Sequence, residues 1–252
     1  MEEIKVRTGY KIENYILEEM LGAGGFSTVY KARSIDPQPE YDPVIAIKVL
    51  HPRRLDRYQI RRFIREAKIA KKLIHPNIVK VYDFKKDEGA FFIFMEFLDA
   101  DLLKCIHTRR EIFSPSILEE IILKSAKGLS FIHQNRIIHK DFNPSNILVN
   151  FSLEKVKITD FGLSVKNTFF YKEKREGGTL DYTAPEIIKG RKASIRSDIY
   201  SFGKTVEKLY NELNFPIPDT FRYIINISTR ENPDERFSNM EEIIYMFEDY
   251  EI

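Results

Sequence analysis

The chain of 252 residues is poor in cysteine, glycine and proline. Glycine and proline occur 11 times each, so the composition excludes collagen-like, disordered and low-complexity proteins. Cys105 is the single cysteine, and one cysteine cannot form a disulfide within the chain. Packing must therefore hold the fold. Because Cys105 lies alone in an apolar stretch, we expect it to be chemically inert.

Long apolar runs and an excess of one charge are also missing. No stretch reaches the roughly 18 apolar residues of a membrane span, and the first 15 residues carry charges throughout, where a signal peptide would be apolar. The 40 basic and 38 acidic side chains leave a net charge of +2, which does not favour nucleic acid as the main partner. We expect a soluble, cytoplasmic protein without a membrane or nucleic-acid partner.

What the chain does contain is a change of pattern along its length. Short apolar or β-branched runs fill the first third, and helical spacing fills the rest, which predicts an α+β protein with two lobes. The expected strands are 15–21, 28–33, 44–50, 79–84 and 90–97. The expected helices are 58–74, 115 to about 135, one from near Ser197, and one from Ser238 with a capping box to Glu241.

Four segments carry residue types that suit phosphate and metal chemistry. Gly22-x-Gly24-x-x-Ser27 joins two strands, and glycine lets backbone N–H groups approach an anion closely, although a hairpin turn explains the same pattern. Lys48 lies in an apolar strand. It either points to water from a sheet edge or reaches a phosphate with Glu66 as its partner.

The third segment is the loop His139-Lys140-Asp141-Phe142-Asn143-Pro144-Ser145-Asn146. Asp141 could accept a hydroxyl proton, and Asn146 and Asp160 offer hard oxygen atoms of the kind that Mg²⁺ prefers. The alternative is a set of turn residues before a strand. Asp160 begins Asp160-Phe161-Gly162, directly after the β-branched run 156–159.

In this order and spacing, the segments resemble the catalytic domain of the eukaryotic-type (Hanks-type) protein kinase superfamily, from about Tyr15 to Phe247. Further matching segments are His75–Val79, Gly178–Glu186, Ser197–Gly203 and Arg236. The resemblance implies a single protein kinase domain over 1–252 with a bilobal fold. Its parts would be a small antiparallel-sheet N-lobe with one regulatory helix (about 10–97), a hinge (about 96–101) and a larger, mainly helical C-lobe (about 102–252). The C-lobe is short between Asp198 and Arg236.

The resemblance also implies roles for individual residues. Lys48, paired with Glu66, would bind the ATP phosphates, and Asp141 would deprotonate the attacking hydroxyl. Asn146 and Asp160 would hold Mg²⁺. Arg236 would pair with Glu186, Thr179 would hydrogen-bond Asp141, and His139 would stack on Phe161. The remaining ATP contacts would come from Leu21, Gly22, Gly24, Val29, Ala46, Met95, Glu96, Leu98 and Leu148.

Two positions in the loop depart from the family pattern. Asn143 stands where serine/threonine kinases usually carry a lysine, so we include it among the catalytic residues and expect lower turnover or compensation by another cation. Lys140 replaces an arginine that grips a phosphorylated activation loop in many members. A lysine cannot make that bidentate contact, which puts control by loop phosphorylation in doubt. Thr168 remains a candidate for autophosphorylation, with a solvated hydroxyl as the alternative.

The resemblance favours an ATP- and Mg²⁺-dependent kinase that phosphorylates serine or threonine in proteins. A nucleotide-binding pseudokinase that acts as a scaffold, or a kinase of small molecules, is the alternative. The stretch 53–72 is strongly basic. It is either a solvated helix face or a docking surface for an acidic partner or for a phosphate on the activation loop.

Overall fold

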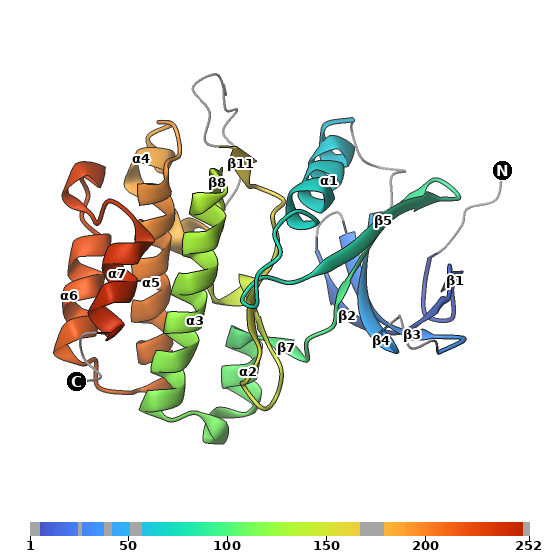
Figure 1. The fold of residues 1–252 in the computed structure, drawn as a ribbon, viewed down its shortest axis with the longest axis horizontal. Helices are drawn as coiled ribbons and strands as arrows, with labels where there is room; N and C mark the ends of the chain where they lie inside the picture. The colour runs from blue at the N-terminus through green and yellow to red at the C-terminus, as the bar shows by residue number, and fades with distance from the viewer. Residues whose placement is uncertain (1–5, 25–26, 38–41, 51–56, 167–178, 249–252) are drawn as a thin grey trace. The chain divides into compact units, whose positions relative to one another are not determined.

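The computed structural model describes residues 6–24, 27–37, 42–50, 57–166 and 179–248. The chain divides into two compact units. The first comprises Met1–Ile74 and Val79–Leu98, and the second His75–Ile78 and Asp99–Ile252. In Figure 1 the sheet of the first unit runs from blue to green-blue, and the helices of the second run from green to red.

The first unit is built on an antiparallel sheet with strand order β1-β2-β3-β4-β6-β5. The predicted strand 44–50 is confirmed at both ends, and the other predicted strands are confirmed with shifted ends. The strands are β1 Lys11–Ile12, β2 Tyr15–Ala23, β3 Ser27–Ser34, β4 Val44–Leu50, β5 Val81–Asp87 and β6 Ala90–Glu96.

The two faces of this sheet bury different partners, because side chains alternate along a strand. Ile45, Ile47 and Val49 of β4 lie in one core cluster, together with Val6 and Ile12 from the start of the chain. The other face carries Leu50 and Ile93, which pack with Phe63 and Ala67 of helix α1, Arg57–Ala70. Helix α1 therefore covers the face of the sheet that also carries Lys48.

Helix α1 ends earlier than predicted. Its expected apolar stripe included Ile74, but Ile74 is 78% exposed. The N–H groups of Lys72 and Leu73 bond to carbonyls three residues back, which tightens and closes the last turn. Pro76 restricts His75 to extended conformations, so the helix cannot continue through this segment. The prediction of a helix reaching residue 74 was wrong by four residues.

The second unit is mainly helical, with short two- and three-stranded sheets. Helix α3 packs on α7, and α5 packs on α6, as Figure 1 shows. The helices are α2 Leu102–Thr108, α3 Pro115–Gln134, α4 Pro185–Ile188, α5 Ile195–Leu213, α6 Asp219–Ser228 and α7 Met240–Glu248. The strands are β7 Ala100–Asp101, β8 Ile137–Ile138, β9 Ile147–Val149, β10 Val156–Ile158 and β11 Val165–Lys166. Single turns of 3-10 helix occupy Arg110–Ile112, Pro144–Asn146, Leu180–Tyr182 and Pro233–Glu235.

Two helix starts follow the expected capping chemistry. Ser114 caps α3 by accepting a hydrogen bond from the N–H of Ile117 at 3.3 Å, with Pro115 in the first turn. Helix α5 starts slightly before Ser197, because Ser194 is its N-cap and Ser197 completes a capping box. The apolar residues predicted for its buried face are at most 2% exposed: Ile199, Phe202, Val206, Leu209, Tyr210 and Leu213.

The predicted capping box at the start of α7 is wrong. Glu241 does not turn back to Ser238, because its carboxylate accepts hydrogen bonds from Ser130 and Gln134 of α3, at 2.6 and 2.8 Å. Glu242 bonds to Ser238 instead, and the side chain of Asn239 accepts a hydrogen bond from the N–H of Glu242 at 3.0 Å. A contact with a neighbouring helix thus replaces the local motif.

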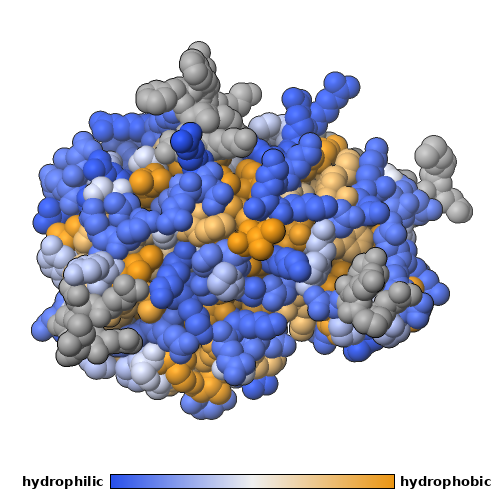
Figure 2. All heavy atoms as spheres, in the orientation of Figure 1, coloured by the Kyte–Doolittle hydropathy of each residue, from blue (hydrophilic) through white to orange (hydrophobic). Residues whose placement is uncertain are grey.

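Among the described residues, no helix is long and apolar enough to cross a membrane. Figure 2 shows mostly hydrophilic side chains on the visible surface, with smaller apolar areas between them. Cys105 is fully buried in α2, and burial raises the pKa of its thiol. Both properties fit the expectation of an inert cysteine.

Candidate active site

The first unit places the predicted lysine and glutamate in direct contact. Lys48 of β4 and Glu66 of α1 form an ion pair, with 2.6 Å between Nζ and Oε1. Both side chains are largely buried, at 14% and 11% exposed. Glu66 is the only acidic residue of α1, and it lies on the part of the helix that packs against the sheet. The edge-lysine alternative for Lys48 is therefore excluded by its contacts.

The strand register gathers most of the predicted nucleotide-binding residues of this unit on one face of the sheet. Gly22 lies opposite Val29, and Val29 lies opposite Lys48. Ala46, two residues before Lys48, lies opposite Met95. Residues directly opposite each other in antiparallel strands share a face. A Cβ atom at Gly22 would meet no atom of the protein within 4 Å, so the space beside this backbone is open.

The remaining residues predicted to contact the nucleotide lie in different surroundings. Leu98 is 5% exposed at the end of the first unit. Gly24 donates its N–H to the carbonyl oxygen of Ser27 at 2.8 Å, and Leu21 is half-buried. Leu148 belongs to β9 of the second unit and is also half-buried. Glu96, the last residue of β6, lies opposite Ile45.

In the second unit, three residues hold the carboxylate of Asp141. Oδ1 accepts hydrogen bonds from the N–H and the hydroxyl of Thr179, at 3.1 and 3.2 Å, and from Asn143 Nδ2 at 3.2 Å. Oδ2 accepts one from Asn146 Nδ2 at 3.2 Å. The predicted contact between Thr179 and Asp141 is thus present. These donors are all neutral, so they orient the carboxylate without neutralising it.

Asn143 is 3% exposed and makes more contacts than its loop position suggests. Its amide nitrogen also lies 3.0 Å from the carbonyl oxygen of Asp141 and 3.4 Å from the hydroxyl of Thr179. Its oxygen accepts the N–H of Ser145 at 2.9 Å. Asn143 therefore connects the loop to Thr179.

The predicted metal ligands lie at the same end of one hairpin. Strands β9 and β10 are antiparallel, with Ile147 opposite Ile158. Asn146 directly precedes Ile147, and its carbonyl oxygen accepts the N–H of Thr159 at 2.9 Å. Asp160 follows Thr159, so the backbone brings both candidate ligands to one place.

The donor set suits a hard cation. Asn146 uses its amide nitrogen to bond to Asp141, at 2.8 Å to the carbonyl oxygen and 3.2 Å to Oδ2. This orientation leaves its amide oxygen for a ligand, and Asp160 supplies a carboxylate, the combination that Mg²⁺ accepts while keeping several waters. No cluster of three or more His, Cys, Asp or Glu that could hold a metal occurs among the described residues.

Asp198 is a residue whose role the sequence reasoning missed. It is fully buried in α5 and accepts the N–H groups of His139 and Lys140, at 2.7 and 2.8 Å. His133 Nε2 lies 2.9 Å from its Oδ2. Lys140 has a left-handed backbone, with φ of 70°, and the bond to Asp198 holds it there. A carboxylate inside the apolar stripe of a predicted helix is the signal that could have revealed Asp198.

His139 and Phe161 contact each other, but not as a parallel stack. Their ring centroids are 5.3 Å apart at an angle of 61°, an edge-on contact. His139 Nε2 also lies 3.0 Å from the carbonyl oxygen of Thr159. The loop that carries Asp141 is thereby joined to the segment that carries Asp160.

Glu186 and Arg236 form the second predicted ion pair. Two guanidinium nitrogens of Arg236 lie 2.9 Å from the two carboxylate oxygens, and Ser197 donates its hydroxyl to Glu186 at 2.8 Å. Burial alone would raise the pKa of Glu186, but the hydrogen bonds from Arg236 and Ser197 outweigh burial and lower it.

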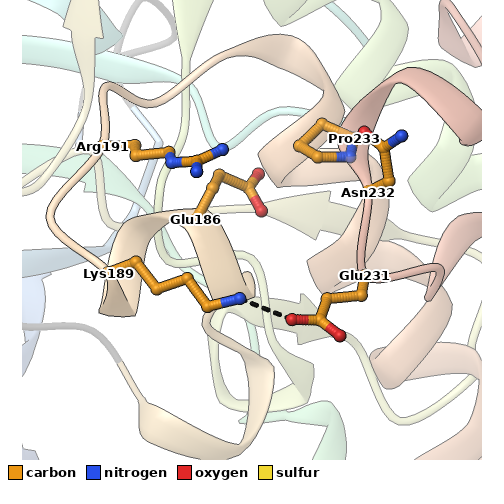
Figure 3. A pocket seen from close by; sticks show the side chains of 6 residues that line it. All are labelled: Glu186, Lys189, Arg191, Glu231, Asn232 and Pro233. Carbon is orange, nitrogen blue, oxygen red and sulfur yellow. Dashed lines mark hydrogen bonds and ion pairs between the residues drawn. The ribbon is translucent and has the colours of Figure 1, made fainter.

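A surface hollow lies beside this pair. Figure 3 shows Glu186, Lys189 and Arg191, which belong to α4 and the segment after it, facing the segment Glu231–Pro233. The ammonium group of Lys189 points to the carboxylate of Glu231, and the two form an ion pair. The pair at Glu186 is therefore part of a larger set of ionic contacts between two segments of the second unit.

Several predicted features lie outside the described residues. These are Thr168, Gly178, and the first part of the basic stretch, with Arg53 and Arg54. Ser164, at the start of the same activation segment as Thr168, is fully buried and donates its hydroxyl to the carbonyl oxygen of His139 at 3.2 Å. Ser164 is therefore not accessible as a phosphate acceptor in this structure.

The fold and these two clusters define a protein kinase domain. The family model of the protein kinase domain matches residues 15–244. The chain belongs to this family.

The chain is also similar to relatives that are named as kinases. The chain is 32% identical over 195 residues to an Aurora kinase of Eremothecium gossypii, covering 77% of this chain and 52% of that protein. It is 34% identical over 196 residues to the human serine/threonine-protein kinase ULK3 (77% and 40% covered). It is also 34% identical over 192 residues to the serine/threonine-protein kinase PrkC of Bacillus subtilis (75% and 29% covered). The matches span about half or less of the length of these relatives.

Proposed function

We propose that this domain, 1–252, is an ATP- and Mg²⁺-dependent kinase that transfers the γ-phosphoryl group to serine or threonine hydroxyls of proteins. The observation that carries the proposal is the carboxylate of Asp141. It is oriented by Asn143, Asn146 and Thr179, and the structure gives it no cationic partner among the described residues. Such a carboxylate is suited to accept a proton from a hydroxyl group.

The other residues of the site take the roles that phosphoryl transfer requires, which are positioning and charge neutralisation. Lys48, fixed by Glu66, binds the nucleotide phosphates, and Asn146 and Asp160 bind Mg²⁺. The cation, when bound, neutralises charge on the transferred group. Nucleotide contacts come from Leu21, Gly22, Gly24, Val29, Ala46, Met95, Glu96, Leu98 and Leu148.

Asn143 distinguishes this site from one that carries a lysine at the same position. It supplies hydrogen bonds to Asp141 and Thr179 but no charge. A lysine at the same position would add a cation near the transferred phosphate. We infer slower phosphoryl transfer than a lysine at position 143 would allow.

Serine and threonine are proposed as acceptors because the named relatives include serine/threonine-protein kinases. The contact between Thr179 and Asp141 supports the same choice. A cytoplasmic location and autophosphorylation of Thr168 are further parts of the proposal. The single cysteine of the chain supports the location, and cell fractionation tests it.

The test is incubation of the purified chain with Mg²⁺, labelled ATP and a generic protein acceptor, followed by mapping of phosphosites by mass spectrometry. Asp141→Asn and Asp160→Ala should abolish labelling, whereas Asp83→Asn, a surface change in the first unit, should not. Label on serine or threonine supports the proposal.

Two results would replace the proposed function with one of its alternatives. Stabilisation by ATP without transfer would indicate a pseudokinase that serves as a scaffold. Transfer to small molecules but not to protein would indicate a small-molecule kinase.

A further inference from the structure

Helix α1 carries an unusual charge pattern. Its 14 residues, RYQIRRFIREAKIA, include five basic side chains and one acidic side chain, Glu66. Glu66 is already paired with Lys48 on the buried side of the helix. The outer surface of α1 therefore carries basic charge without acidic residues of the same helix to balance it.

Most of this charge lies in one stripe. At 100° per residue, Arg57, Arg61, Arg65 and Lys68 fall within about 80° of one another around the helix axis. We call these four residues the basic stripe. They lie opposite Phe63 and Ala67, which pack against the sheet. Arg57, Arg61 and Lys68 are exposed and Arg65 is half-buried. In Figure 2 hydrophilic side chains project from the surface formed by α1.

The basic stripe opposes the stability of the helix that carries it. Like charges three or four residues apart repel, and Arg57–Arg61, Arg61–Arg65 and Arg65–Lys68 have this spacing. The first turn of α1 holds no acidic residue, so Arg57 also lies near the positive end of the helix dipole. Within the described part of the chain, Arg57 and Lys68 form no ion pair, and the neighbouring Lys71 pairs with Asp83. A helix charged in this way gains stability when an anionic partner lies along the stripe.

We propose that the basic stripe is a docking surface for an acidic segment of a partner protein. This inference concerns an interaction of the domain and does not depend on the proposed kinase activity. Charge complementarity with several carboxylates in a row selects the occupant.

Other anionic partners fit this surface less well. A helix that binds a membrane inserts apolar residues between its basic ones, but Phe63, Ala67 and Ala70 of α1 are buried against the protein. Single-stranded nucleic acid is held by aromatic stacking as well as charge, and Tyr58 is the only exposed aromatic residue in the described length of α1. An acidic polypeptide needs neither feature.

The test uses the whole chain and a short fluorescein-labelled peptide in which glutamate alternates with serine. Binding is measured by fluorescence anisotropy, with a glutamine–serine peptide as the neutral probe. The stripe variant is Arg57→Gln, Arg61→Gln and Lys68→Gln. The matched control, Lys11→Gln, Lys104→Gln and Arg222→Gln, removes the same charge from exposed sites elsewhere.

We expect the stripe variant to bind the glutamate peptide about tenfold more weakly than the unaltered chain, and the control variant to bind it unchanged. Added salt should weaken binding of the unaltered chain. The stripe variant should also melt about 2 °C higher, because repulsion is relieved. Weaker binding together with higher stability is not expected of a merely solvated helix face.

Equal binding by the stripe and control variants would overturn the proposal, as would equal binding of the neutral peptide. Tighter binding of anionic lipid vesicles or of single-stranded DNA would overturn the choice of a protein partner. Asp141→Asn should bind the peptide like the unaltered chain. A chain that binds the peptide but never transfers phosphate would refute the proposed function alone, and an active chain that does not bind the peptide would refute this inference alone.

Discussion

The two buried ion pairs of this chain are built in different ways. Lys48 and Glu66 form an ion pair with 2.6 Å between Nζ and Oε1, and their side chains keep 14% and 11% exposure. Arg236 and Glu186 meet through two contacts at 2.9 Å, with side chains 0% and 6% exposed. A lysine is a compact charge that can exchange partners, whereas the planar guanidinium group fixes its partner in two directions.

The surroundings of the two pairs also differ, because Arg236 is held by further contacts with the backbone. Arg236 also donates hydrogen bonds to the carbonyl oxygens of Arg196, Arg230 and Glu231, and its guanidinium lies 4.9 Å from the ring centroid of Tyr200. It therefore ties together separate segments of the second unit. Lys48 lies on the same face of the sheet as Gly22, two strands away, and the backbone of Gly22 has open space beside it. We interpret the Arg236 pair as structural and the Lys48 pair as one that serves a ligand.

Arg236→Ala should have the largest effect on stability. Removing one partner of a buried pair leaves the other charge uncompensated, which costs about 3 to 5 kcal/mol, and here three backbone carbonyls also lose their donor. We expect the melting temperature to fall by roughly 10 °C, as measured by calorimetry. Arg236→Lys keeps the charge but loses the bidentate contact. Its melting temperature should therefore lie between those of the unaltered chain and Arg236→Ala. A change of less than about 1 kcal/mol in Arg236→Ala would refute the structural interpretation.

Lys48→Met should reduce kinase activity strongly and stability only slightly, the reverse of the effects expected for Arg236→Ala. Removal of an electrostatic contact to the reacting group costs about 10²- to 10³-fold in rate. The same change should cost less stability than Arg236→Ala, about 2 kcal/mol, because the side chains of Lys48 and Glu66 are more exposed than those of Arg236 and Glu186. Kinase assays and thermal melts on the same preparation measure both quantities. Unchanged activity would remove Lys48 from the proposed site.

The ion pairs and the secondary structure were predicted from two different kinds of sequence signal. Each pair joins short motifs with a characteristic spacing, so the resemblance to kinases supplied Glu66, Glu186 and Arg236 together. Secondary structure came from local periodicity, which fixed β4 at Val44–Leu50 and the buried face of α5. Local signals failed where a distant side chain competes, as at Glu241, which bonds to Ser130 and Gln134 of another helix.

Acid should weaken the Arg236 pair through Glu186. Its pKa is lowered in the folded protein, since the hydrogen bonds from Arg236 and Ser197 outweigh the effect of burial. The unfolded chain then binds the proton more tightly, so the pair contributes fully above the ordinary value of 4.5 and loses its contribution as the pH falls below it. The difference in melting temperature between the unaltered chain and Glu186→Gln should therefore shrink from neutral pH to strongly acidic pH. A constant difference would show that the charge of Glu186 does not stabilise the fold.

Of the three ion pairs compared, the exposed pair of Lys71 and Asp83 should contribute least to the stability of the fold. Its side chains are 51% and 44% exposed at a distance of 2.9 Å, and exposed pairs contribute about 0 to 1 kcal/mol. Lys71→Gln should therefore leave the melting temperature almost unchanged. The hydrogen bond from Lys71 lowers the pKa of Asp83, so the variant should move that pKa back toward its ordinary value, as an NMR titration would show. If Lys71→Gln destabilised the chain as much as Arg236→Ala, then geometry and burial would not explain the difference between the ion pairs.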